Sequence, residues 1–586
     1  MSVERRPSFE RVARVKGTLL EYLSLGASLV GIVALAVLLV YVAVDAFDLA
    51  SASHEWILTY VGTVVVPLVA LFLYSADDPG LTVRVTLALG GGPIASFMAF
   101  RLLAAMGGSV PGLTWSVFYL FAFVVPTTAY VLYAGSQGPI GATAVGLLGR
   151  LLGGIAAGLA LVVLFVVFDP QLWTLAYTLG VLPTGALVAF ARRRESSLAN
   201  RLALPVGIIG FLAATVLDGL LVFYVRTWLL YVWSVAAPVA LGVGLLAARE
   251  RDRREAALVG ALAFAVPVAG SLAGTLVGVA PRHALLVLLT LAVPTARFVR
   301  RALDADEGAL GLVAPLLLAG GAVVGTLVVQ AGGFPAPDPW LDWSYVTSAP
   351  SRHPEQAGLY PAIVGSIFVI CLVAVLSFVL GVGTAVFLED YTADEGLSGT
   401  ITRVIQVNVA NLAAVPSVVY GLLGLGLFAN MLGMGFGTVT TASLTLSLLI
   451  LPITIISAQE AIRAVPDHLR QGSYAMGATR WQTTKNVVLP EALPGILTGT
   501  ILALGRAIGE TAPLIMIGAP TTVFSPPEGF ASRVSAMPMQ IYAWADAPQP
   551  EFRYGVVAAG VVTLLVVLLA LNGTAILIRN RYETEV

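Results

Sequence analysis

The chain has 586 residues, of which 58% are hydrophobic and 11% are charged, and its mean hydropathy is +0.91. Polar side chains this scarce cannot cover the surface of a soluble globule, so the composition predicts an integral membrane protein. The formal net charge is −1, and the arginines occur in short clusters rather than on one basic face. That distribution argues against a nucleic acid as a partner, and it favours membrane lipid as the surroundings.

Apolar runs long enough to span a bilayer recur along the whole chain. A transmembrane helix needs about 20 apolar residues, and about sixteen uncharged runs of that length occur. The sequence therefore predicts an all-α, polytopic membrane protein of about sixteen transmembrane helices. The expected spans are 19–44, 55–74, 81–105, 113–133, 140–168, 172–191, 202–224, 228–248, 257–279 and 284–300, followed by 309–331, 359–388, 404–432, 437–458, 496–519 and 555–579.

Cysteine and histidine offer no metal site. The single cysteine, Cys371, lies inside an expected span, so neither an intrachain disulfide nor a thiolate site can form. The four histidines, His54, His283, His353 and His468, lack the spacing of metal ligands. We expect no metal in this chain.

The basic residues between the spans predict an orientation. Lys and Arg next to transmembrane helices prefer the cytoplasm. With the N-terminus inside, strict alternation places the basic clusters inside and makes both termini cytoplasmic in a multi-pass protein of the cell membrane. These clusters are Arg192–Arg194, Arg249–Arg254, Arg297–Arg301, Arg403, the segment 459–490, and Arg579 with Arg581.

An acidic break near 302–308 suggests a division into two regions, 1–304 and 305–586. The same orientation places the Pro-rich segments 332–358 and 520–554 outside. The first carries Trp340, Trp343 and Tyr345, and the second carries Tyr542 and Trp544. Trp and Tyr suit the membrane–water boundary, so we interpret them as anchors there, with docking of a partner as the alternative.

The inside segment 459–490 is amphipathic and unlike the short turns elsewhere. Pro466 and Asp467 can start a helix, Gly477 breaks it, and a second short helix is expected from Thr479 to Leu489–Pro490. Two short helices at a glycine elbow would fit into a groove of a soluble partner. The alternative is an amphipathic loop that lies on the membrane surface.

Two ionisable residues, Arg506 and Glu510, interrupt an otherwise apolar span. Such a group costs at least ~2.5–3.5 kcal/mol at membrane depth, so it normally faces a partner or an aqueous path. Spaced four apart, they are expected on one helical face, where they can pair. Arg506 could then turn its forked donors to an oxyanion, whereas the alternative is a purely structural ion pair.

The segment 459–490 resembles the cytoplasmic coupling loop of ABC importer permeases, whose pattern is Glu-Ala-Ala, three residues, Gly, and a stretch that ends in Leu-Pro. Here Gln471 stands for the Glu and Gly472–Ser473 for the Ala pair, while Gly477 and Leu489–Pro490 are kept. The run Gly509–Leu514 resembles phosphate permeases of the PstA type, rather than the sister PstC type. Further similar segments are Tyr360–Ser366, Phe387–Tyr391 and Ala414–Leu422, so that the resemblance covers roughly 305–580.

This resemblance implies site residues. The substrate path would include Arg506, Glu510 and Thr511. Many PstA-type chains carry an Arg shortly after the Leu-Pro of the preceding span, but the matching position after Leu451–Pro452 is Ile456. The contacts to the ATPase would come from Gln471, Ser473, Ala475, Gly477, Ala478, Arg480, Trp481, Leu489 and Pro490.

The resemblance also implies a function and partners. The chain would be the permease subunit of an ATP-driven importer and form, with a PstC-like permease, the path for inorganic phosphate. A PstS-like external binding protein would deliver the phosphate, and a PstB-like ATPase dimer would bind ATP and Mg. The chain itself has no P-loop, and its lysines are confined to Lys16 and Lys485, so we expect no nucleotide cofactor and no enzyme activity in it.

Three alternatives stay open. The importer could carry another oxyanion, such as molybdate or sulfate, because one arginine does not choose among tetrahedral anions. The first region could instead form a membrane-embedded enzyme that uses Asp218 or His283 as acid–base groups, although no paired motif supports it. Finally, the first region could be a sensor of phosphate status or an assembly platform.

Overall fold

The structure, a computed structural model, describes residues 7–76, 78–167, 170–194, 197–248, 252–277, 279–305, 308–392 and 396–583. Within these ranges the chain is helical and has no strand; one isolated antiparallel bridge joins Thr438 to Arg533. The predicted all-α fold is confirmed. The basic residues before Pro7, and residues 249–251 and 306–307 of the segments named above, lie outside the described ranges.

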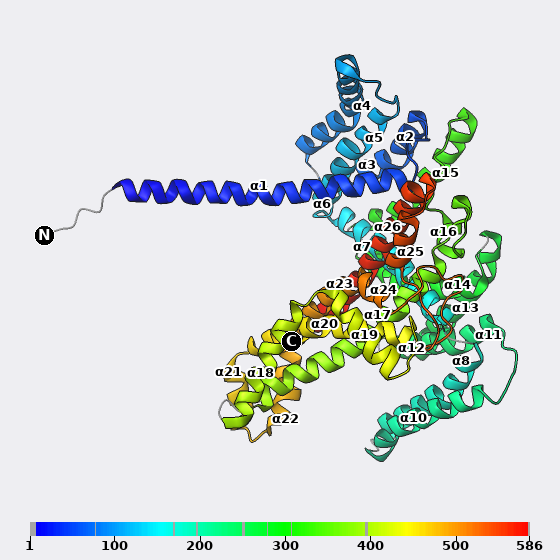
Figure 1. Cartoon of the computed structure of the whole chain (residues 1–586). Coiled ribbons are helices and arrows are strands. Elements are labelled where there is room, and N and C mark those ends of the chain that lie inside the picture. Colours follow the sequence, from blue (N-terminus) through cyan, green and yellow to red (C-terminus); the bar gives the residue numbers. More distant parts are fainter. Residues whose placement is uncertain are drawn as a thin grey trace.

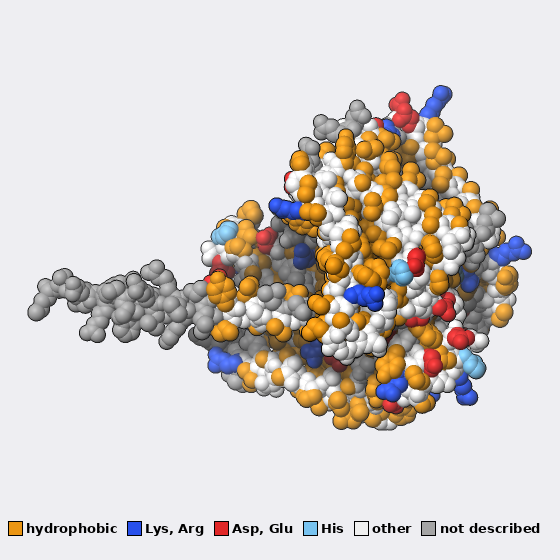
Figure 2. Space-filling model, turned by 90° about the horizontal axis from the view of Figure 1, so that it is seen from above, with side chains coloured by type: hydrophobic (Ala, Val, Ile, Leu, Met, Phe, Trp, Pro, Cys, Tyr) orange, Lys and Arg blue, Asp and Glu red, His pale blue; other side chains and the backbone are white. Residues whose placement is uncertain are grey.

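Fourteen described helices are long and apolar enough to cross a membrane, and a bent pair, Thr402–Ala413 with Ser417–Met431, would be a fifteenth. The remaining expected span, 140–168, corresponds to α7 (Pro139–Val167). The multi-span architecture is therefore confirmed. Figure 2 shows apolar side chains over much of one face, with charged groups scattered among them.

The first region is built of α1 (Pro7–Ala46) and a series of paired helices that follows it. The remaining helices are α2 (His54–Tyr60), α3 (Val66–Ala76), α4 (Pro79–Gly107), α5 (Thr114–Tyr119), α6 (Val125–Gly135), α7, α8 (Pro170–Ala176), α9 (Leu182–Arg194), α10 (Ser197–Asp218), α11 (Thr227–Tyr231), α12 (Ala237–Ala247), α13 (Arg253–Ala273) and α14 (Pro281–Asp304).

Four spans of this region repeat one local design. In each, a short helix with a Trp near its start runs into a five-residue π-helical segment, and the next helix has Pro as its second residue. Pro has no N–H and clashes with the carbonyl four residues before it, and a wider π turn accommodates this. The repeated tryptophans are Trp56, Trp115, Trp173 and Trp228, and the prolines are Pro67, Pro126, Pro183 and Pro238.

The helices after the acidic break form the second series. They are α15 (Ala314–Gly332), α16 (Trp343–Thr347), α17 (Tyr360–Val386), α18 (Gly396–Ala413), α19 (Ser417–Gly424), α20 (Val439–Arg463), α21 (Asp467–Ala475), α22 (Arg480–Thr483), α23 (Leu489–Ile508), α24 (Ala512–Met516), α25 (Met537–Ala545) and α26 (Val557–Glu583). Helices α17, α20, α23 and α26 pack side by side and carry the main hydrophobic core. Figure 1 shows α21 and α22 at one end of this group and α16 and α25 toward the other.

The expected straight span 404–432 is wrong in one respect, because the chain bends by 108° within it. The bend lies at Val415–Pro416, where the residue before a proline is held out of the helical region. The backbone carbonyl of Leu412, near the end of α18, accepts hydrogen bonds from the Tyr420 hydroxyl at 2.8 Å and from the Val415 N–H at 3.0 Å, and these bonds hold the two sides of the bend together. Helix α19 thereby turns to lie against α24.

The two aromatic segments form one packed cap. Tyr345 and Trp544 are only 2% and 5% exposed, and their ring centroids lie 6.0 Å apart. The Tyr345 hydroxyl also donates to the carbonyl of Val556 at 3.1 Å. These two side chains are thus part of the core, while Trp343 and Tyr542 remain exposed and fit the expected boundary position.

The two regions meet along α1, α7 and α15. Helix α1 packs on α26, and α7 packs on α17. Helix α15 follows the expected division at 304/305, but it packs against α2, α3 and the π segment between them, where Tyr60 and Thr326 are hydrogen-bonded at 3.0 Å. By its packing, α15 goes with the first region.

Candidate functional site

The charged pair of the sequence lies where α23 ends. Arg506 is in its last turn, the helix stops at Ile508, and Glu510 and Thr511 follow in the break before α24. The guanidinium Nε of Arg506 donates to Oε1 of Glu510 at 3.3 Å. The predicted pair is therefore present, but the expectation that both residues share one helical face is wrong, because Glu510 lies beyond the helix.

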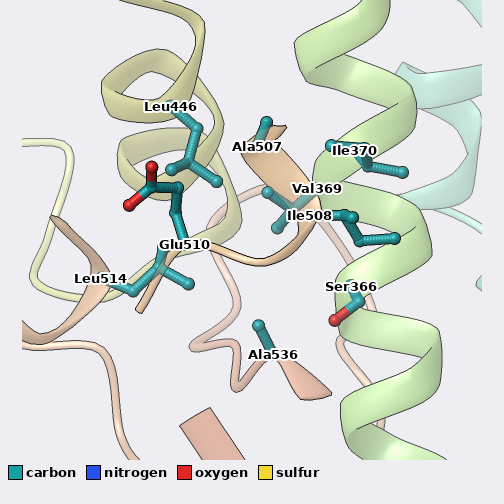
Figure 3. Close-up of a pocket in the computed structure, with 9 residues that line it drawn as sticks. All are labelled: Ser366, Val369, Ile370, Leu446, Ala507, Ile508, Glu510, Leu514 and Ala536. Carbon is teal, nitrogen blue, oxygen red and sulfur yellow. The ribbon is translucent and has the colours of Figure 1, made fainter. Parts of the chain in front are cut away.

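A pocket opens beside this pair. It has about 250 Å³ of empty space, including its open mouth, and its wall comes from α17, α20, α23, the break after α23, α24 and the stretch before α25. The nine lining residues are Ser366, Val369, Ile370, Leu446, Ala507, Ile508, Glu510, Leu514 and Ala536. In Figure 3 the Glu510 side chain extends past Leu446, and the Ser366 side chain lies on the opposite wall, with Ala536 below.

The three expected path residues thus have different positions. Glu510 lines the pocket and its side chain is 17% exposed, whereas Arg506 pairs with it from outside the lining and is 44% exposed. Thr511 is half-buried and precedes α24 as its N-cap, without a capping hydrogen bond from its side chain. A carboxylate inside the pocket would repel an anion, but the paired Arg506 guanidinium offsets its charge.

Sequence reasoning did not single out Ser366, although it lies in a segment noted for its resemblance. Its hydroxyl accepts the backbone N–H of Met537 at 2.8 Å, so it holds the stretch before α25 against α17. A small hydroxyl in a run of apolar residues was the available signal. Gly421 of α19 marks another close approach, since a Cβ there would meet Met516 and Pro513.

The predicted glycine elbow is present at the far end of α20. Helix α21 starts after Pro466 and ends before Gly477, whose φ of +82° turns the chain back. Thr479 then caps α22 in a capping box with Gln482. The buried hydroxyls of Ser473 and Thr483 are 2.8 Å apart and tie the two arms together.

The second arm differs from the expected short helix. Helix α22 does not end at Leu489–Pro490 but continues through a π-helical segment, η10 (Thr484–Val488), into α23. Pro490 is the second residue after that segment, as in the repeated spans of the first region. The helix that is long and apolar enough to cross a membrane runs over Arg480–Ile508 and not over 496–519, and the second arm of the elbow is its first part.

The elbow presents a partly apolar exposed surface. Met476 is 85% exposed, Trp481 56% and Tyr474 45%. Among the residues expected to contact a partner, Gln471, Ala475, Gly477, Arg480 and Pro490 are also exposed, Ala478 and Leu489 are half-buried, and Ser473 faces the other arm.

The acid–base candidates of the first region are separate from both sites. Asp218 accepts a hydrogen bond from Gln171 at 3.0 Å, and the Nε2 of His283 accepts one from Arg282 at 3.2 Å. Neither residue lines the pocket, and no group of three or more potential metal ligands occurs among the described residues.

Comparisons with known proteins place the second region in a family. Residues 381–582 match the family described as binding-protein-dependent transport system inner membrane component. The chain is 35% identical over 229 residues to the phosphate transport system permease protein PstA 1 of Mycobacterium tuberculosis (strain CDC 1551 / Oshkosh), covering 39% of this chain and 72% of that protein. It is 34% identical over 182 residues to the probable ABC transporter permease protein YqgI of Bacillus subtilis (strain 168), covering 31% of this chain and 60% of that protein.

Among solved structures, a chain of the MetNI methionine ABC transporter in inward-facing conformations is 18% identical, with a TM-score of 0.30. That match covers 37% of this chain and 93% of the other. These two sequence relatives match 31% and 39% of this chain, and the expected resemblance to PstA-type permeases is confirmed.

Proposed function

This chain belongs to the family of binding-protein-dependent permeases that includes PstA-type phosphate permeases, with an additional multi-span region before the family domain, and on that premise we propose that it forms half of a transmembrane path for inorganic phosphate. The single observation that carries the proposal is the 35% identity over 72% of a PstA protein. The other half would be a PstC-like sister permease, and delivery of phosphate would be the task of a PstS-like external binding protein.

The elbow supports a role in coupling to a PstB-like ATPase dimer. An exposed helix pair with Met476, Trp481 and Tyr474 at its tip has the shape and the apolar contacts that a groove in a soluble partner can bind. Gln471 occupies the place of the family Glu, so this interface would depend on packing and neutral hydrogen bonds at that point. ATP and Mg would be bound by the ATPase, and the permease itself would catalyse no reaction.

The ion pair supports a path for an anion. With the path empty, Glu510 neutralises Arg506 across 3.3 Å. When an oxyanion enters, the guanidinium can offer it two parallel N–H donors in place of the carboxylate. Arg506 is partly exposed, and Leu502, four residues before it on the same face of α23, is exposed as well, so a sister permease would cover this face.

The proposed orientation follows the basic clusters. The elbow and both termini would be cytoplasmic in the cell membrane, and the cap around Tyr345 and Trp544 would be external. Closure of the ATPase dimer on the elbows would then rock the two permeases between outward-open and inward-open states.

Uptake of labelled phosphate tests the proposal. Vesicles would contain this chain with its candidate sister permease and ATPase, with the external binding protein on the opposite side to ATP. We expect ATP-dependent uptake in the native complex, a strong loss in Arg506→Gln, and partial activity in Arg506→Lys, which keeps the charge but loses the fork. Unchanged uptake in Arg506→Gln would reduce the pair to a structural role.

Competition with other oxyanions tests the substrate. We expect excess unlabelled phosphate to abolish the signal and molybdate or sulfate to leave most of it. If the native complex accumulates sulfate or molybdate instead, the protein is an importer of that oxyanion and the phosphate proposal is wrong.

A further inference from the structure

A cluster of charged residues joins the elbow to α17. The π-helical end of that helix, η8 (Phe387–Tyr391), carries Glu389 and Asp390 side by side. Glu389 accepts hydrogen bonds from Arg463 Nε at 2.9 Å, from Arg463 Nη2 at 2.6 Å and from Gln459 Nε2 at 2.7 Å. Glu389 therefore fastens the end of α17 to the end of α20.

Asp390 makes a different set of contacts. Its Oδ1 accepts from Arg470 Nη1 at 2.7 Å, and its Oδ2 accepts from the Thr484 hydroxyl at 2.7 Å. Arg470 belongs to α21 and Thr484 to the segment that continues α22, so one carboxylate holds both arms of the elbow. Arg470 also donates to the carbonyl of Ile462 at 2.8 Å.

These contacts are largely withdrawn from water. The Asp390 side chain is 5% exposed and that of Arg470 is 20% exposed. A buried ion pair costs desolvation, and replacement by apolar residues is often as stable, so stability alone is a weak reason for such a pair. Its directional hydrogen bonds do, however, fix one register between the elements that they join.

The apolar contacts around the pair cannot fix that register. Around the pair, Ala385 and Val386 of α17 pack with Ile462, Val488 and Ile496 in a small apolar cluster. Apolar burial is non-directional, so such surfaces can slide over each other. Glu389 holds α17 to α20, but among the described residues only Asp390 ties the end of α17 to α21 and η10 by side-chain hydrogen bonds. Without the Asp390 contacts, the two arms of the elbow could therefore move without moving α17.

Helix α17 runs from this cluster to the pocket. Asp390 lies 24 positions after Ser366, which corresponds to roughly 36 Å of helix at 1.5 Å per residue. Ser366, Val369 and Ile370 form the α17 side of the pocket wall. A displacement at the elbow that moves α17 as a rigid rod therefore moves the wall opposite Glu510.

We infer that Asp390, through Arg470 and Thr484, is a positioning residue that locks both arms of the elbow to α17, so that force applied at the elbow reaches the pocket wall. This inference rests on the proposed function, because it presumes an ATPase at the elbow and transport through the pocket. It assigns Asp390 no contact with substrate.

The test measures phosphate imported per ATP hydrolysed in the assembled complex. We expect Asp390→Asn and Arg470→Gln each to lower this ratio roughly tenfold or more while ATP hydrolysis continues. A change of that size is typical when the coupling between two sites is lost. The double variant should be no worse than either single variant, because both remove the same link. Glu460→Gln is the matched control: its side chain is 68% exposed and its carboxylate pairs with Arg463 rather than with either arm of the elbow, so the ratio should stay native.

A second measurement covers variants that assemble poorly. In a Cys371→Ser background, Asp390→Cys with Thr484→Cys would be joined by a short, reducible bifunctional thiol reagent. We expect a low ratio before cross-linking, a restored ratio after it, and loss again on reduction.

The outcomes separate the two claims. If the native complex imports no phosphate, the proposed function fails. If the native complex transports but the ratio is native in Asp390→Asn and Arg470→Gln, or is the same with and without the cross-link, the lock is refuted and the proposed function stands.

Discussion

At the scale of single residues, a substitution at Gly477 tests the effect of backbone conformation alone, because no packing contact changes there. Its φ is +82°, and a Cβ at this position would meet no atom within 4 Å. In Gly477→Ala we expect destabilisation of the elbow by about 1–2 kcal/mol, because L-residues are disfavoured in the left-handed region. The measurement is binding of the ATPase to the permease pair, which should weaken.

Gly472→Ala is the matched control. It also faces open space, but it lies within α21, where Ala is the better helix former. Its ATPase binding should equal or exceed that of the native chain. Equal weakening in both variants would mean that the surface, and not the turn, decides the interaction.

The sequence predicted Arg506 and Glu510 because charges within an apolar run are conspicuous. It could not identify Asp390 with Arg470, since these residues are 80 positions apart: Asp390 follows the end of an expected span, Arg470 lies in the inside segment 459–490, and charges are common at both kinds of place. Asp390 and Arg470 come together because α17 packs on α20. The periodicity of apolar residues within one helix does not tell which other helix it packs on.

At the scale of elements, α15 depends on a glycine contact. A Cβ on Gly321 would collide with the backbone carbonyl of Thr63, whereas Gly320 beside it faces open space. We expect Gly321→Ala to destabilise the protein by about 1–3 kcal/mol through overpacking, and Gly320→Ala to be close to neutral. Thermal unfolding in detergent measures the difference; equal melting temperatures for the two variants would contradict the close packing of α15 on the first region.

Hydropathy predicted where most spans lie but not their course. The apolar run 404–432 is continuous in composition, yet it bends by 108° because Pro416 restricts Val415. Conversely, Pro490 was predicted to end a short helix, but the helix continues past it because the π-helical turn η10 accommodates the proline. A proline removes the same N–H in both places, so the outcome depends on whether the neighbouring helices favour a bend or a π turn.

At the scale of the whole molecule, the first region and the site are separable. The pocket and the elbow are formed by α17 to α24 with the stretch before α25. The first region contacts the second series mainly through α1, which packs on α26, and through α7, which packs on α17. We expect a chain without residues 1–335 to keep ATP-dependent uptake per assembled complex but to melt at a lower temperature, because the α1–α26 and α7–α17 contacts are lost.

Uptake and melting temperature must be measured on the same preparation of that truncated chain. Native melting with no uptake would assign the first region to the transport path. Native uptake with lower melting would fit an assembly platform, for which the ten expected spans before residue 305 would provide membrane-embedded surface rather than a pore.

The repeated design of Trp, π segment and Pro has a consequence for how the first region can change in evolution. Each of the four copies is followed by a second apolar helix, so the repeating unit is a pair of spans. Duplication or deletion of one whole unit leaves every later loop on its original side of the membrane. The region can therefore grow or shrink in steps of two spans without turning the elbow away from its side.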